Sequence, residues 1–296
     1  MFFSKFRKLV LYSLLLVFTT TTFAETFLKR KIAVARFTNE TQSGMTFLVD
    51  DSGDRIGKQA SDILSSRLAA TGKFLMFERS DKDEIDSEKI ISGLKNEGVG
   101  VEYLIIGSVS EFGRSSESES QIFKRTKSQR AFAKVNVRLV DVSTGRIIYS
   151  EEGAGESVNS AESRAFSKIS AGFDQSLTDK AISAAISTLV SNLVENMTNK
   201  PWKSYILSNE DGLYVIAGGE KQGLQVGSKL IVYQNGKIIK NPQSGAMIEL
   251  PGKKVGTISI ESSFGDDEFS EISFATLDDG KLSDDFTNYY ISDKWI

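Results

Sequence analysis

Residues 133–150, which read AKVNVRLVDVSTGRIIYS, decide the fold of the first half of the chain. The apolar side chains at 133, 135, 137 and 139 alternate with polar ones, and this alternation predicts a strand with one buried face. The tripeptide at 143–145 (Ser-Thr-Gly) predicts a tight turn, after which Arg146 to Ser150 returns as the partner strand. The stretch therefore predicts a β-hairpin.

The segments around this hairpin predict further strands and helices. The nearly continuous apolar run YLIIGSV predicts a strand that is covered on both faces. The strongest helix is expected at the wide apolar stripe before Asn199-Lys200-Pro201. The predicted strands are 31–37, 74–77 and 103–109, and the predicted helices are 55–71, 80–95 and 179–197. Residues 111–130 and 151–177 are predicted to be polar excursions, the second with helical spacing at Ala161, Ala165, Phe166 and Ile169.

The pattern of apolar and turn-forming residues changes after Pro201. Short apolar runs alternate with Gly, Asn and Asp turns, which is typical of a small all-β barrel or sandwich. We therefore expect three parts: a leader at 1–24, an α/β domain at 25–200 and a small β domain at 201–296.

Composition excludes several kinds of chemistry. The 296 residues include 36 Lys+Arg and 39 Asp+Glu, but neither His nor Cys. A catalytic triad with His, a thiolate nucleophile, a disulfide and a Cys/His zinc site are therefore excluded. No cofactor site is predicted, and an acidic chain does not suit nucleic acid. No spacing of the remaining groups points to catalysis, so the protein is predicted not to be an enzyme.

Residues 1–24 have the pattern of a secretory signal peptide. A basic start is followed by an apolar run at 9–18 and by a cleavage site after Ala24. The alternative is an uncleaved membrane anchor, but the run is about half of the ~20 residues that a span needs. Since no Cys is present to carry a lipid, the prediction is an exported protein of the Gram-negative periplasm that is not a lipoprotein.

Three segments in order resemble the CsgG family, whose founding member is the curli secretion channel. They are IGKQASDILSSRLAATGKFLMFER, YLIIGSVSEF and AKVNVRLVDVSTGRIIYSEEG. The resemblance covers about 30–200 and implies an α/β (α+β) domain with a mixed sheet and flanking helices. The later stretches GLQVGSKLIVYQNGKIIKNPQSG and VGTISIESSF are similar to the small C-terminal β-barrel of the flagellar assembly protein FlgT.

The chain departs from the pattern of a secretion pore. In such a pore each subunit lends β-hairpins to a shared outer-membrane barrel, whose strands of about 9–11 residues alternate apolar and polar side chains. The insertions at 111–130 and 151–177 are too polar for lipid-facing strands. They favour a relative that is soluble in the periplasm.

Two sets of residues are candidates for interaction. The basic cluster Lys124, Arg125, Lys127 and Arg130 could meet an anionic partner, or could be a solvated loop. Trp202 and Tyr205 could pin the two domains together, which we favour, or could form a ligand platform. The pairs Gly98/Gly100 and Gly153/Gly155 lack the further Gly and the Lys of a phosphate-binding loop.

Two functions remain open. The favoured one is a non-enzymatic periplasmic assembly or scaffold protein that acts through self-association, an envelope protein partner or peripheral contact with the outer membrane. The alternative is an outer-membrane secretion channel component that exports an extracellular fibre subunit. It rests on the family resemblance alone.

Overall fold

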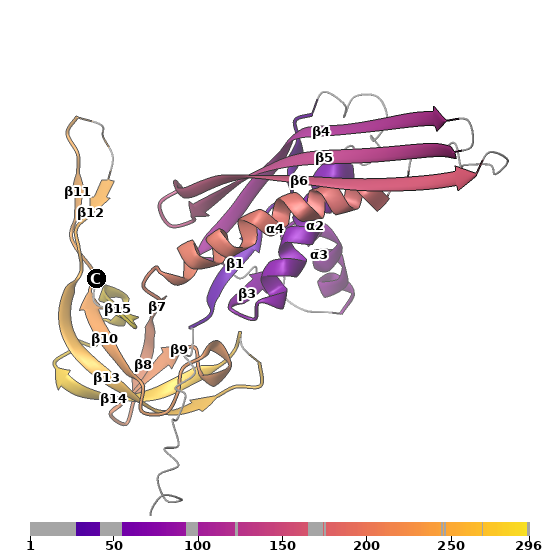
Figure 1. Ribbon diagram of the computed structural model, residues 1–296. Coiled ribbons are helices and arrows are strands. Elements are labelled where there is room, and N and C mark those ends of the chain that lie inside the picture. Colours follow the sequence, from indigo (N-terminus) through magenta and orange to yellow (C-terminus); the bar gives the residue numbers. More distant parts are fainter. Residues whose placement is uncertain are drawn as a thin grey trace, which may run out of the picture.

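The computed structural model in Figure 1 has an α+β part, followed by a curved all-β part. The structure describes residues 28–41, 55–92, 100–121, 124–164, 174, 176–243, 245, 247–267 and 269–294. The predicted leader at 1–24 lies outside them and stays a prediction.

The first sheet is mixed, as the family resemblance implies. Its order is β3-β1-β4-β5-β6, and the short β2 lies beside β4. Strand β1 runs parallel to β3 and β4, whereas β4, β5 and β6 are antiparallel. The strands are β1 (Arg30–Val34), β2 (Thr38–Asn39), β3 (Phe74–Phe77), β4 (Tyr103–Gln121), β5 (Lys124–Asp141) and β6 (Arg146–Arg164). The predicted hairpin is confirmed as β5 and β6.

The three predicted helices are also confirmed: α2 (Arg55–Ala70), α3 (Lys82–Ile91) and α4 (Ser176–Thr198). Helix α4 lies across β5 and β6, and α2 packs beside it (Figure 1). The apolar stripes of both helices meet the buried face of the sheet in one core, as expected for amphipathic helices. Helix α3 buries no side chain.

The prediction of polar excursions at 111–130 and 151–177 is wrong, as is the prediction of a helix at Ala161. Strands β4, β5 and β6 continue through these segments and form a long ribbon, residues 110–121, 124–134 and 153–164 (Figure 1). Cross-strand pairing satisfies the backbone there, so polar side chains do not prevent strands. Residues 165–173 lie outside the described part of the chain.

Two glycines bring β6 into close contact with α4. A Cβ at Gly155 would lie 2.2 Å from the backbone nitrogen of Ala185, and one at Gly153 would lie 2.4 Å from the carbonyl oxygen of Ala185. Any side chain at either position would push the helix off the strand. The Gly-x-Gly pattern therefore serves close packing of a helix on a sheet.

A side-chain network fastens the same helix to β6. The Tyr149 hydroxyl donates to Glu151 Oε2 at 2.7 Å, and Asn192 Nδ2 of α4 donates to Glu151 Oε1 at 2.6 Å. Burial and the hydrogen bond to Glu151 raise the pKa of the Tyr149 phenol from 10.0 to about 12. The folded protein therefore favours the neutral form of the Tyr149 phenol over the ionised form.

This shift predicts a loss of stability in alkali. Between pH 10 and about 12 the unfolded chain releases the Tyr149 proton, whereas the folded chain keeps it. The contribution of the Tyr149 phenol to the free energy of unfolding is therefore fully present below pH 10, and it disappears as the pH rises through the pKa of the folded state. Urea midpoints measured from pH 9 to 12 should fall less steeply for Tyr149→Phe than for the wild type. Tyr205→Phe, which removes an exposed phenol, is the control; equal slopes for Tyr149→Phe and the wild type would contradict this assignment.

The second sheet confirms a small barrel-like all-β part. Its order is β7-β15-β10-β13-β14-β9-β8. Its ends approach each other where Ser204 Oγ donates to the Ala217 carbonyl at 2.5 Å and Ala217 N donates to the Tyr205 carbonyl at 3.1 Å. The strands are β7 (Lys203–Ser204), β8 (Ile206–Glu210), β9 (Leu213–Ala217), β10 (Lys229–Gln234), β13 (Lys253–Phe264), β14 (Ile272–Gly280) and β15 (Tyr289–Ser292), with 3-10 turns η2 (Glu220–Gln222) and η3 (Phe286–Asn288). It encloses a second core around Trp202, Ile216 and Val232.

A separate two-stranded hairpin projects from this sheet (Figure 1). It consists of β11 (Ile238–Lys240) and β12 (Met247–Glu249). It follows directly on the antiparallel pair β10 and β13, whose last paired residues are Gln234 and Lys253.

Candidate functional site

The two predicted sets of interaction residues lie in different parts of the molecule. The basic cluster lies on β5 of the ribbon (Figure 1), whereas Trp202 and Tyr205 directly precede and follow β7 in the sequence. Arg130 is exposed and forms an ion pair with Glu156 of β6, Nε to Oε1 2.9 Å. The side chains of Lys124, Arg125 and Lys127 lie outside the described part.

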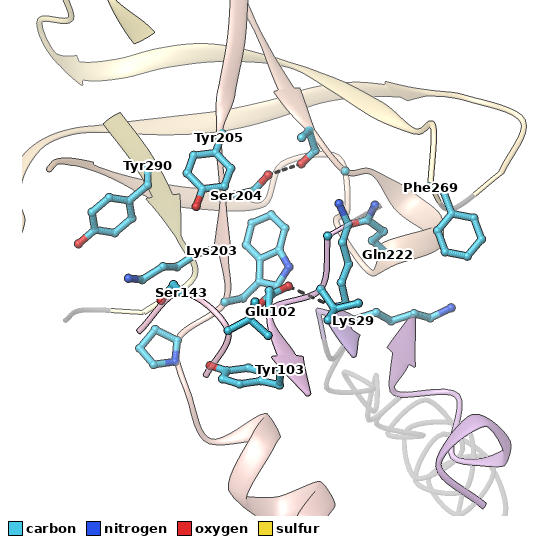
Figure 2. Close-up of a pocket in the computed structure, with 18 of the residues that line it drawn as sticks. Lys29, Glu102, Tyr103, Ser143, Lys203, Ser204, Tyr205, Gln222, Phe269 and Tyr290 are labelled. Carbon is cyan, nitrogen blue, oxygen red and sulfur yellow. Dashed lines mark hydrogen bonds between the residues drawn. The ribbon is translucent and has the colours of Figure 1, made fainter. Parts of the chain in front are cut away.

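Trp202 and Tyr205 line a pocket between the α+β part and the second sheet (Figure 2). The pocket has a volume of about 860 Å³. The α+β part contributes the start of β4 and the turn after β5, and the other wall comes from the chain after α4 and from the second sheet. Trp202 is 2% exposed, whereas Tyr205 is 60% exposed. The two aromatic residues thus differ: the first is a core residue and the second faces solvent.

Arg30 joins the walls of this pocket. Its side chain is 3% exposed and donates to the carbonyl of Pro201 at 2.8 Å and to the carbonyl of Lys200. Its Nη1 also lies 3.6 Å from Glu102 Oε2, just before β4. One buried guanidinium therefore connects β1, the start of β4 and the chain that follows α4.

Burial governs the ionisation of the neighbouring groups. It raises the pKa of the Glu102 carboxyl, although Lys31 N donates to Glu102 Oε1 at 3.1 Å and Arg30 lies close. Burial also raises the pKa of Tyr103. Because the Glu102 carboxyl is bonded to Lys31 and Arg30, its position suits a structural junction better than acid–base catalysis.

Further contacts hold the same junction. Lys29 N donates to the Gln222 carbonyl at 2.8 Å, and the rings of Phe77 and Phe269 meet edge to face at 5.0 Å. Within the described ranges, no group of three or more acidic residues is placed to hold a metal ion.

Sequence reasoning missed Arg30 and Glu102. A single charged residue at the start of an apolar strand normally lies in solvent, so the sequence carries no sign that Arg30 is buried. The role of Arg30 depends on its contact with Pro201, which lies 171 residues further along the chain. The pairing of β1 with β4 and the return of the chain after α4 bring these residues together.

Residues 16–226 match the family described as curli production assembly/transport component CsgG. The chain belongs to the CsgG family. It is 35% identical over 176 residues to a Neisseria meningitidis serogroup B protein named "Putative lipoprotein NMB1126/NMB1164", a match that covers 58% of this chain and 78% of that protein.

Two solved structures are similar at low identity. A PelC dodecamer from Paraburkholderia phytofirmans is 15% identical, with 56% of this chain and 89% of that chain covered and a TM-score of 0.27. Lipoprotein GNA1162 from Neisseria meningitidis is also 15% identical, with 57% and 98% covered and a TM-score of 0.25. Neither likeness bears on function.

The prediction that this protein is not a lipoprotein is wrong, because the Neisseria relative carries the name of a lipoprotein. The prediction rested on the absence of Cys, and this absence concerns only a lipid that is attached to a Cys. It does not determine the class of protein in which this domain occurs. The similarity of the C-terminal part to FlgT stays a prediction, as do the domain boundaries. None of the helices in the described residues has the length and apolar character needed to cross a membrane.

Proposed function

We propose that this CsgG-family chain is a non-enzymatic assembly protein of the cell envelope that acts by self-association. Copies would join edge to edge through the ribbon, with β6 of one copy pairing with β4 of the next. The open strand edges of the ribbon carry this proposal.

Both outer strands of the ribbon have an unpaired side in the described part of the chain. Strand β6 is the last strand of its sheet. Strand β4 pairs with β1 and β2 only up to Val109. Over residues 111–121, β5 is the one strand that pairs with β4 in the described part of the chain. Exposed strand edges carry backbone N–H and C=O groups that are ready to pair with another chain. Two different edges on one ribbon allow head-to-tail pairing.

The side chains of the ribbon suit contact in water. On one face, Ser115, Arg130 and Val158 form a row across the three strands. Among the ribbon side chains that the structure describes, only Phe132 and Val158 are large, apolar and exposed. The ion pair between Arg130 and Glu156 crosses β5 and β6. Main-chain pairing between copies would therefore provide most of the affinity.

Cysteine cross-linking tests this arrangement without background, because the chain has no Cys. Ser115→Cys on β4 and Ser160→Cys on β6 place one thiol near each edge. With a short bismaleimide, the full chain carrying both substitutions should give a ladder of covalent dimers, trimers and larger species. Each single variant should give no ladder.

The matched control is Ser87→Cys with Ser187→Cys, two exposed serines on α3 and α4. It should give no ladder under the same conditions. Dimers from Ser160→Cys alone would indicate β6-to-β6 pairing and contradict the head-to-tail arrangement. A monomer in sedimentation velocity at all concentrations, with no cross-linked species, would contradict self-association.

The length of the ribbon strands favours a second candidate, a secretion channel component. The described strands β4, β5 and β6 contain 19, 18 and 19 residues, more than the about 9–11 that a membrane strand needs. Single-channel conductance in planar bilayers by the assembled protein would support this candidate over a scaffold. Release of all the protein from membranes by a salt wash would argue against it.

A further inference from the structure

The hairpin of β11 and β12, together with its flanking residues 237–252, is an unusual surface, which we name the arm. Its exposed aliphatic side chains are Ile238 (63%), Ile239 (46%), Ile248 (43%) and Leu250 (40%). Strands β11 and β12 pair only with each other in the described part of the chain. The arm therefore exposes apolar side chains that no other element covers.

The arm has a defined direction because its base is anchored. Asn235 N donates to the Asn288 carbonyl at 2.8 Å, and Asn235 Nδ2 donates to the Thr287 carbonyl at 3.0 Å. A Cβ at Gly236 would lie 1.7 Å from the Leu250 carbonyl oxygen, so the two strands cross at a point where only glycine fits. These contacts hold the arm away from the second sheet.

The charge of the arm is opposite to that of the whole chain. Residues 237–252 contain two lysines and one glutamate, and Lys253 and Lys254 follow at the start of β13. Residues 237–254 together have a formal charge of +3 on a chain whose net charge is −3. Lys237 and Lys240 flank the exposed isoleucines of β11. Aliphatic side chains among lysines are the combination that binds the interface of an anionic bilayer.

A protein partner explains this surface less well. Ile239 pairs with Ile248 on one face of the hairpin, and Ile238 points to the other face because side chains alternate along a strand. A flat protein surface would cover only one of these faces, whereas lipid surrounds both. The four exposed side chains also provide far less than the roughly 1,200 Å² that a stable pair of proteins buries.

We propose that the arm is a membrane-surface anchor that inserts its aliphatic side chains into the interface of an anionic bilayer. Its lysines contact the headgroup phosphates, and the rigid base holds the rest of the protein at a fixed orientation to the membrane.

Vesicle flotation of the full chain tests the anchor. With vesicles of phosphatidylcholine and phosphatidylglycerol at 7:3, the wild type should float at least tenfold more than with pure phosphatidylcholine. The variant Ile238→Ser/Ile239→Ser/Ile248→Ser/Leu250→Ser should lose at least tenfold of this binding. Lys240→Glu removes one positive charge and adds a negative one, so it should lose about thirtyfold, which corresponds to twice the free-energy contribution of one lysine near an anionic surface.

Matched controls separate the arm from the rest of the surface. Ile90→Ser/Ile91→Ser removes two aliphatic side chains that are 70% and 78% exposed on α3, and Lys281→Glu reverses an exposed charge elsewhere. Both should keep wild-type binding. Unchanged flotation of the arm variant would overturn the proposal. So would loss of self-association by that variant with lipid binding retained, since a second copy would then be the partner.

Discussion

Replacing Arg30 by methionine is expected to lower the free energy of unfolding by about 3 kcal/mol, because removal of one partner leaves buried polar groups unpaired. The guanidinium is 3% exposed. Its loss would remove the hydrogen-bond donor of the Lys200 and Pro201 carbonyls and the ion-pair partner of the Glu102 carboxylate. Methionine keeps most of the length of the side chain, so the loss of stability would come from the missing polar contacts and not from a cavity. Urea unfolding followed by circular dichroism measures it.

Arg138→Met is the control for this measurement, because Arg138 is exposed on β5 and its replacement should change the stability by less than about 0.5 kcal/mol. Limited proteolysis provides a second readout. Trypsin should cleave Arg30→Met faster than the wild type after Lys203, where the chain enters the second sheet. Wild-type stability together with wild-type cleavage would show that Arg30 does not hold the junction.

Gly155→Val is expected to destabilise the protein by about 3 kcal/mol through overpacking. A Cβ at this position would lie 2.2 Å from the nitrogen of Ala185 and 2.4 Å from the carbonyl oxygen of Ala181. Both atoms belong to the backbone of α4, which cannot move aside without opening the core. Thermal unfolding should show a clearly lower midpoint, and binding of a hydrophobic dye should rise as α4 separates from β6.

Ala154→Val is the matched control, since Ala154 is the neighbouring residue on β6 and its side chain is exposed on the opposite face. Valine favours strands, so this variant should be as stable as the wild type or slightly more so. If both variants were destabilised equally, the cause would be the strand itself and not the contact with α4.

The sequence predicted most elements of the fold but not the ribbon. The strand at 133–139 has one buried face, and its alternation is visible because burial selects apolar side chains on that face. The ribbon residues 111–121 and 153–164 have no such pattern, because both faces of the ribbon beyond the core carry polar side chains. Their strand conformation comes from pairing with β5, a neighbour that no single segment reveals.

The candidate site shows the same division. The sequence singled out Trp202 and Tyr205 because aromatic residues beside a proline linker are conspicuous, yet it could not show that one is buried and the other exposed. In the sequence, the arm is only one of the short apolar runs that alternate with turns after Pro201. Its exposure depends on the absence of a strand against β11 or β12 in the described part, which is a property of the assembled sheet.

By itself the sequence determined the family, the order of helices and strands around the first core, and the change to an all-β part after Pro201. These follow from local patterns of apolar residues, which record the face that each element buries. Only the tertiary structure decided the length of the ribbon, the burial of Arg30 and the position of the arm. Each of these depends on which distant segments meet, and the energy of such contacts leaves no periodic signal in the chain.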